Sequence, residues 1–260
     1  MQDQLKVHLI QTDTVWKNIT ENIENISQKI SQITEQADLF VLPEMFSTGF
    51  VMEPSEVAEP MDGTAVTWMI DTAKSKDCAI TGSLIIKENN KFYNRLIFVH
   101  PSGEIEYYNK KHLFSHAGED KVYTTGTERK IIEYKGWKIA AFVCYDLRFP
   151  VWSRNTENYH IALYVANWPK TRINAWDILL KARAIENICY TIGVNRIGID
   201  ANELEYIGHS QITNPLGNNI KKSTIAVEDI ISTTLYKAEI LKDRKDFKFL
   251  EDRDDFQLKN

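Results

Sequence analysis

Apolar residues recur along the chain with two periods, one typical of strands and one typical of helices. Residues 6–12 are rich in apolar and β-branched side chains, as expected of a buried strand. The isoleucines that follow are spaced by three and four residues, at Ile19, Ile23, Ile26, Ile30 and Ile33. This spacing predicts an amphipathic helix. After an apolar strand at 39–42, a second helix is expected to begin near Thr64, which is predicted to be its N-cap.

Strand patterns dominate the rest of the chain. Further strands are predicted at residues 79–87, 92–100, 104–109, 131–134, 137–143, 161–166, 191–199 and 224–235. Short polar turns join the first three into a meander, and Lys135-Gly136 is predicted to form a hairpin turn. Apolar positions between 174 and 189 have helical spacing. Strands alternating with few, long helices indicate a layered α/β fold.

Composition narrows the class of protein. The chain has 260 residues, of which 43% are hydrophobic and 26% charged, and this balance predicts one globular domain over residues 1–260 with a charged tail from about residue 242. The net charge of -5, without a dense basic stretch, argues against nucleic-acid and membrane partners. Apolar runs are too short to span a bilayer, and the amino terminus does not resemble a secretory signal, so we expect a cytoplasmic location.

The cysteine content argues against disulfides and metal sites. Cys78, Cys144 and Cys189 are an odd number at wide spacing, with no CxxC pair, and are predicted to be free thiols. No set of closely spaced His and Cys ligands occurs, and no GxGxxG motif follows a strand. We therefore expect neither a metal nor a dinucleotide cofactor.

Three residues with catalytic side chains follow predicted strands. Cys144 comes directly after an apolar strand, where a thiolate can be exposed and the amides of the next turn can donate to an oxyanion. A buried structural cysteine is the alternative. Glu44 leaves the strand at 39–42, and Lys110 ends the strand at 104–109. Since ligands bind beyond the carboxyl ends of strands in layered α/β proteins, the three side chains form a candidate site.

The strings around these residues carry a family resemblance. LPEMFSTGF, KKHLF and CYDLRFP occur in this order, each after a strand pattern, and resemble the Glu, Lys and Cys motifs of the nitrilase (carbon-nitrogen hydrolase) superfamily. ALYVANWP, LLKARAIEN and VNRIG extend the likeness and resemble the ω-amidase branch. The sequence departs from many superfamily members at Val151, where a glutamate often follows Phe-Pro. The resemblance implies a four-layer αββα sandwich that forms a homodimer.

The resemblance also implies residue roles. Glu44 would be the general base, Lys110 the oxyanion stabiliser and Cys144 the nucleophile that forms a thioester. Glu119 would help to hold the lysine and position the substrate, and the backbone N–H of Tyr145 would share the oxyanion. No cofactor is required.

Other residues near these motifs are candidates for supporting roles. Trp168 is a candidate for lining the acyl pocket, with an ordinary core position as the alternative. Asp146 and Arg148 are expected to brace the turn around Cys144 rather than to contact substrate.

Family membership suggests the substrate. The ω-amidase branch implies small ω-monoamides of 2-oxo dicarboxylic acids, such as 2-oxoglutaramate and 2-oxosuccinamate. Their free carboxylate needs a cationic partner, and Arg172, Lys170 and Arg196 are candidates by position. Each also has an ordinary interpretation as a solvated or structural charge.

Three alternatives remain open from the sequence. The same triad can hydrolyse N-carbamoyl compounds or other aliphatic amides. A Cys-His hydrolase would use His112, His160 or His209, although none lies in a recognisable partner motif. A catalytically silent binding module of the same fold would be expected to lack a triad residue, and this chain retains all three.

Overall fold

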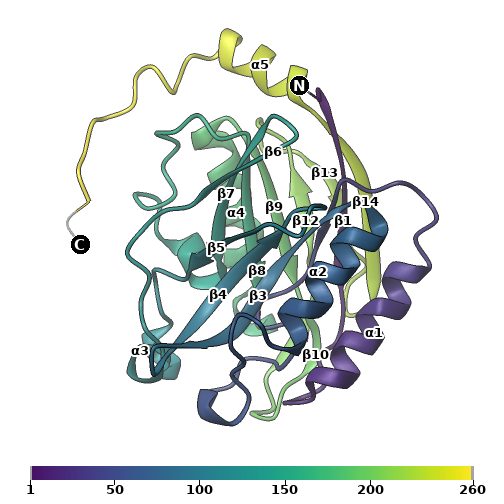
Figure 1. The fold of residues 1–260 in the computed structure, drawn as a ribbon. Coiled ribbons are helices and arrows are strands. Elements are labelled where there is room, and N and C mark those ends of the chain that lie inside the picture. Colours follow the sequence, from purple (N-terminus) through teal and green to yellow (C-terminus); the bar gives the residue numbers. More distant parts are fainter. Residues whose placement is uncertain (1, 259–260) are drawn as a thin grey trace.

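Two six-stranded sheets packed face to face form the centre of the molecule, and helices cover their outer faces (Figure 1). The computed structural model describes residues 2–258. The first sheet contains β1 (Gln4–Gln11), β2 (Leu39–Val41), β3 (Ala79–Glu88), β4 (Lys91–Val99), β5 (Ile105–Asn109) and β14 (Asp229–Tyr236). The second contains β6 (Ile131–Tyr134), β7 (Trp137–Val143), β8 (Ile161–Ala166), β9 (Tyr190–Asn195), β12 (Gln211–Thr213) and β13 (Asn219–Lys222). The helices are α1 (Ile19–Ser31), α2 (Thr64–Lys76), α3 (Glu119–Val122), α4 (Ile173–Asn187) and α5 (Lys237–Asp246).

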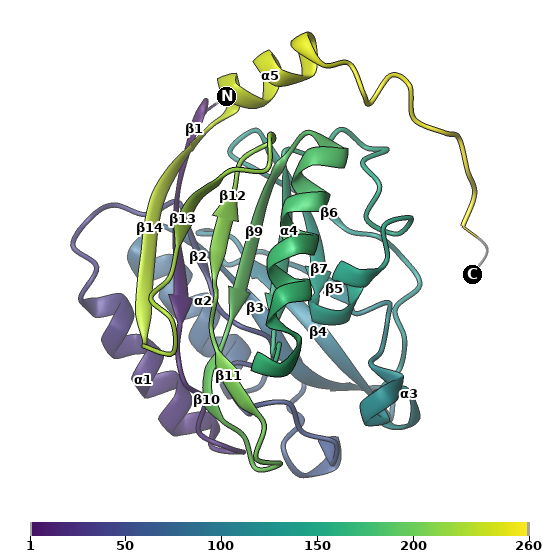
Figure 2. The same cartoon turned by 180° about the vertical axis from the view of Figure 1, so that it is seen from behind.

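The two sheets share a plan of parallel central strands with antiparallel edges. The first has the order β14-β1-β2-β3-β4-β5, in which β1, β2 and β3 are parallel. The second has the order β13-β12-β9-β8-β7-β6, in which β7, β8 and β9 are parallel. A separate hairpin of β10 (Ile197–Ile199) and β11 (Glu205–Ile207) extends from one end of the molecule (Figure 2).

Successive side chains of a strand point to opposite faces of the sheet, and both faces are covered in this fold. In β2, Leu39 and Val41 belong to the core between the sheets, whereas Phe40 packs on the side of α1 and α2. A strand covered on both faces reads as a continuous apolar run, which is the pattern that the sequence displays there. The four-layer αββα sandwich predicted from the sequence is confirmed.

Helices form the two outer layers, and each packs its apolar face against a sheet. Ile26 and Ile30 of α1 and Met69 of α2 are buried against the first sheet. Trp176 and Leu180 of α4 are buried against the second, and α4 lies over this sheet in Figure 2. Within residues 2–258, no helix is long and apolar enough to cross a membrane.

Most predicted elements are present, and the meander and the Lys135-Gly136 hairpin turn are confirmed. The N-cap prediction for Thr64 is wrong, because Gly63 is the N-cap of α2. The carboxylate of Glu59 instead accepts hydrogen bonds from the backbone N–H groups of Thr64 (2.9 Å) and Ala65 (3.0 Å). A carboxylate from outside the helix thus satisfies two of the free N–H groups of the first turn.

Two predicted strands have different bounds. The strand expected at 191–199 is divided at Arg196 into β9 and β10, which belong to different sheets. The strand expected at 224–235 begins only at Asp229. The charged tail predicted from about residue 242 begins inside α5, and residues 259–260 lie outside the described part of the chain.

Candidate active site

The residues with catalytic side chains lie at the carboxyl ends of strands from both sheets. Glu44 follows β2 and Lys110 directly follows β5 in the first sheet, whereas Cys144 directly follows β7 in the second. The strands β2, β5 and β7 therefore deliver their side chains to one edge of the sandwich, where the two sheets meet. Sandwich topology, rather than proximity in sequence, brings these groups together.

Lys110 lies between two buried carboxylates. Its Nζ donates to Oε1 of Glu44 at 2.8 Å and to Oε2 and Oε1 of Glu119 at 2.9 and 3.1 Å. The side chain of Lys110 is 1% exposed, and both glutamates are completely buried. Such a cluster is tolerated away from water only because each charge has a close partner.

The surroundings control the protonation of this cluster. Burial by itself would lower the pKa of Lys110, but the charges of Glu119 and Glu44 raise it above its ordinary value, so the lysine stays cationic. Burial raises the pKa of Glu119, and the charge of Glu44 adds to this effect, while Lys110 opposes it. The site holds one cation against two carboxylates.

Glu119 is held in place by its own loop. It is the first residue of the short helix α3, and its Oε2 accepts a hydrogen bond of 2.6 Å from the backbone N–H of Phe114. The contact with Lys110 that the family resemblance implied for Glu119 is thus present in the structure.

Cys144 occupies a sharp turn between β7 and a 3₁₀ segment, Cys144–Arg148. Its φ angle of 44° lies in the left-handed region, an uncommon conformation for a residue with a side chain. Asp146 braces the turn, because its buried carboxylate accepts hydrogen bonds from Val143 N–H (3.0 Å) and from the hydroxyl of Tyr108 (2.8 Å). The turn resembles the nucleophile elbow of serine hydrolases.

Cys144 is half-buried and lines a cavity, whereas Cys78 and Cys189 are buried. The surrounding protein desolvates the thiol of Cys144 and raises its pKa, and the charge of Glu44 adds to the effect. A thiol with a raised pKa is protonated at rest. It therefore requires a base to become a nucleophile, and Glu44 is the neighbouring carboxylate that can take its proton.

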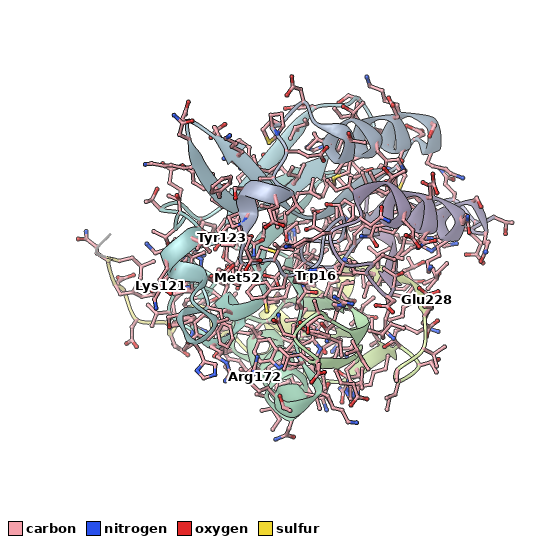
Figure 3. All side chains as sticks on the ribbon, turned by 90° about the horizontal axis from the view of Figure 1, so that it is seen from below. Trp16, Met52, Lys121, Tyr123, Arg172 and Glu228 are labelled. Atoms are coloured by element: carbon pink, nitrogen blue, oxygen red, sulfur yellow. The ribbon has the colours of Figure 1, made fainter. Side chains whose placement is uncertain are left out.

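A cavity of about 270 Å³ opens onto these groups. Its lining includes Cys144, Lys110, Tyr145 and Trp168, together with apolar side chains of the loop after β2, among them Met52. Met52 and Arg172 are labelled in Figure 3, which views the molecule from below. A volume of this size suits a small molecule rather than a polymer.

Two guanidinium groups line the cavity. The guanidinium of Arg172 lies over the ring of Phe114 at 5.1 Å, and that of Arg148 lies over the ring of Trp168 at 4.8 Å. Among the described residues, neither guanidinium has an ion pair or a side-chain hydrogen bond. The aromatic faces hold them in place and leave their N–H donors available to a ligand anion.

The structure separates the cationic candidates. Lys170 is exposed and pairs with Glu205 at 2.7 Å, and it does not line the cavity. Arg196 is completely buried, and it pairs with Asp13 at 2.8 Å. Both residues thus fit their ordinary interpretation as solvated or structural charges. The side chain of Arg148, which was expected to brace the turn rather than to contact substrate, lies at the cavity wall.

The three candidate histidines of a Cys-His hydrolase lie elsewhere. His112 contacts Asp146 at 2.8 Å, and His209 contacts Asp177 at 2.9 Å. His160 accepts a hydrogen bond from Lys138 N–H, and burial lowers its pKa to about 4. None of the three lines the cavity with Cys144. Within residues 2–258, no group of three or more His, Cys, Asp or Glu side chains is arranged to hold a metal ion.

Two asparagines in contact with Glu44 escaped the sequence analysis. Asn167 directly follows β8, and its backbone N–H donates to Oε2 of Glu44 at 2.7 Å while its side-chain amide donates to the Glu44 carbonyl at 2.9 Å. Its position after an apolar strand is the same signal that singled out Cys144. Asn94 donates from Nδ2 to Oε1 of Glu44 at 2.7 Å, and the available signal was a polar residue inside an apolar strand.

Comparisons with known proteins place this geometry in context. The family model described as carbon-nitrogen hydrolase matches residues 6–244. The chain is 41% identical to the ω-amidase YafV of Escherichia coli strain K12 over 256 residues, which covers 98% of each chain. It is 33% identical to the 2-oxoglutaramate amidase of Bacillus subtilis strain 168 over 216 residues, which covers 81% of this chain and 83% of that one.

One solved structure is similar to this chain over almost its whole length. It is a carbon-nitrogen hydrolase superfamily protein from Xanthomonas campestris with an arsenic adduct in its active site. The TM-score is 0.97 at 38% sequence identity, covering 99% of this chain and all of the other.

Proposed function

The chain belongs to the carbon-nitrogen hydrolase family, and from this membership we propose that it is an ω-amidase that releases ammonia from small ω-monoamides of 2-oxo dicarboxylic acids. The observation that carries the proposal is the buried Glu44–Lys110–Glu119 cluster beside the half-buried Cys144, in a cavity lined by two guanidinium groups that have no ion pair among the described residues. Relatives named ω-amidase and 2-oxoglutaramate amidase support this substrate class.

Acylation begins at the thiol. Glu44 takes the proton of Cys144 as the sulfur attacks the amide carbonyl and a C–S bond forms. The carbonyl electron pair moves to oxygen, where Lys110 and the backbone N–H of Tyr145 stabilise the oxyanion. When the tetrahedral intermediate collapses, the C–N bond breaks, the nitrogen takes the proton back from Glu44, and ammonia leaves a thioester on Cys144.

Deacylation repeats the same proton transfers with water. Glu44 accepts a proton from the water that attacks the thioester, and the same two donors stabilise the second oxyanion. Collapse breaks the C–S bond, the sulfur of Cys144 recovers its proton from Glu44, and a carboxylic acid is released. Every proton is carried by the protein's own side chains.

Charge in the cavity favours an anionic substrate. The guanidinium groups of Arg148 and Arg172 have no carboxylate partner among the described residues, and a dicarboxylic monoamide supplies one carboxylate at the end remote from the amide. A guanidinium binds carboxylate through paired N–H donors. This favours ω-monoamides over N-carbamoyl compounds or uncharged aliphatic amides that lack such a group.

Replacing Arg172 by methionine should weaken recognition of the substrate carboxylate. Loss of a hydrogen bond to a charged group is expected to lower kcat/KM for 2-oxoglutaramate roughly 10- to 100-fold. An uncharged aliphatic amide of similar length should be hydrolysed as by the wild type, because the long apolar stem over Phe114 is retained. Steady-state ammonia release from the two substrates measures the difference.

Lys170→Met is the matched control, since Lys170 is a nearby cation that pairs with Glu205 outside the cavity. It should leave both substrates unaffected. Equal losses for the charged and the uncharged amide in Arg172→Met would count against carboxylate recognition while leaving the amidase assignment intact.

The remaining predictions concern organisation. We propose one carbon-nitrogen hydrolase domain over residues 1–260, a cytoplasmic location, and a homodimer. The carboxyl-terminal segment after α5 carries exposed apolar side chains, including Phe247 and Phe249, and extends away from the sheets (Figure 2). Such a segment is suited to packing against a second subunit.

A further inference from the structure

Two like charges share a very small buried volume at the base of the site. Glu44 and Glu119 are completely buried, and each has an oxygen within 3.1 Å of the same lysine nitrogen. Neighbouring carboxylates in a dry site tend to capture one proton between them, as the repulsion between the two charges favours a neutral partner. A base that must accept the proton of Cys144 cannot already carry one.

Asn94 contacts both carboxylates. Its Nδ2 donates to Oε1 of Glu44 at 2.7 Å and to Oε1 of Glu119 at 3.1 Å. A carboxamide nitrogen has two hydrogens, so one N–H is available to each oxygen. Among the described residues, the buried Oδ1 of Asn94 has no hydrogen-bond partner, so the contacts of its side chain are those of Nδ2 with the two carboxylates.

The backbone fixes Asn94 in register with the lysine. Strands β4 and β5 pair so that Arg95 lies opposite Asn109, and the backbone N–H of Lys110 donates to the carbonyl of Asn94 at 2.9 Å. Asn94 is 1% exposed. The sheet therefore delivers the amide and the ammonium from adjacent strands to the same pair of carboxylates.

We propose that Asn94 is a positioning residue that keeps Glu44 and Glu119 ionised together, so that Glu44 is free to take the proton of Cys144. This role rests on the proposed function. Asn94 does not line the cavity, and it acts on the reaction only through the two carboxylates. A carboxamide suits this place because it donates two hydrogen bonds without adding a charge.

The direction of the pH effect follows from the groups that face Glu44. These are Lys110, Glu119 and Cys144, with the phenol of Tyr123 close enough for the charges of Glu119 and Glu44 to affect its ionisation. Without the two N–H donors of Asn94, the repulsion is offset only in part, by Lys110 and by the backbone N–H groups of Asn167 and Phe114. The pair then takes up a proton at higher pH, and the acid limb of the rate profile moves upward.

The test is the pH dependence of kcat for 2-oxoglutaramate in Asn94→Ala. Hydrogen bonds to charged groups of ordinary strength predict an upward shift of the acid limb by about one to two pH units. Below the limb, kcat should therefore fall roughly 10- to 100-fold, whereas at alkaline pH it should return close to the wild-type value, with KM changed less than about 2-fold. A purely structural role would lower kcat equally at every pH.

Asn155→Ala is the matched control. Asn155 is also completely buried and donates from Nδ2 to the carbonyls of Tyr159 and Asn187, without contact to the cluster. Its loss should reduce thermal stability and leave the acid limb in place. The rate at which iodoacetamide alkylates Cys144 can also be measured across pH in the wild type and in both variants. This measurement does not depend on amide turnover.

A double-mutant cycle with Glu119→Gln identifies the cause. If Asn94 acts by separating two negative charges, its effect on the acid limb should shrink when Glu119 is neutral. An unshifted limb in Asn94→Ala, or an equal shift with and without the Glu119 charge, would overturn the inference while leaving the amidase intact. Failure of the wild type to release ammonia would instead contradict the proposed function, and the alkylation profile would still test Asn94.

Discussion

Replacing Cys144 by alanine is expected to abolish ammonia release, with a loss of at least about 10⁴-fold in kcat. The reason is that the mechanism has no other nucleophile: without the sulfur, no thioester forms, and Lys110 and Glu44 have only a water molecule to act upon. The protein should remain folded, because the side chain lies at the cavity wall and alanine retains the same Cβ. Ammonia release and circular dichroism together measure both outcomes.

The other two cysteines provide matched controls. Cys78 and Cys189 are completely buried, and burial raises the pKa of each thiol to about 12, so neither is suited to nucleophilic attack. Cys78→Ala and Cys189→Ala should lose some stability and retain kcat. Substantial turnover in Cys144→Ala would show that the nucleophile lies elsewhere.

Replacing Lys110 by methionine is expected to damage catalysis and folding together. Loss of an oxyanion donor costs roughly 10²- to 10³-fold in kcat, and the carboxylates of Glu44 and Glu119 also lose their cation. Removing one partner of a buried ion pair costs about 3–5 kcal/mol, so the free energy of unfolding should fall by a comparable amount. Urea unfolding and ammonia release measure the two effects.

The stability loss should depend on pH in a defined direction. Burial already raises the pKa of Glu119, and removal of Lys110 raises it further. The folded variant then holds protons that the unfolded chain releases above its ordinary glutamate pKa, so stability relative to the wild type falls as pH increases. The deficit should be small near pH 4 and largest near pH 8.

Lys111→Met serves as the control for this variant. Lys111 is adjacent in sequence, but its Nζ lies over the ring of Trp152 rather than between carboxylates. Its replacement should cost less than about 1 kcal/mol. A stability loss in Lys110→Met that is equal at low and high pH would contradict the view that the lysine neutralises buried carboxylates.

Much of the candidate site was visible in the sequence because its residues follow strand patterns. Cys144 directly follows the apolar strand β7 and Lys110 directly follows β5, and topology places the carboxyl ends of both strands at one edge. Glu119 lies in a loop without a strand pattern, and only the family resemblance singled it out.

The direction in which each side chain points could not be predicted from the sequence. Arg148, Arg172 and Arg196 look alike in a pattern of charges, yet two line the cavity and the third is buried against Asp13. Asn94 stands inside a strand, so its contact with Glu44 depends on which face of β4 it occupies and on its pairing with β5.

Short elements were also missed for a physical reason. Strands β11 and β12 have three residues each, too few for a period of two to be distinguished from chance. Pairing rather than local pattern defines them: β11 pairs with the three-residue β10, and β12 pairs with β9 and β13. The division between β9 and β10 likewise depends on pairing, because β9 pairs with β12 and β10 pairs with β11.

The central claim is a thioester on Cys144, and the most direct test is the mass of the protein during turnover. Wild-type enzyme mixed with 2-oxoglutaramate and quenched in acid within the first turnovers should gain the mass of the substrate less ammonia. Peptide mapping should locate this addition on Cys144, and Cys144→Ala should gain nothing. Rapid ammonia release without any adduct, or an adduct on another residue, would contradict the mechanism.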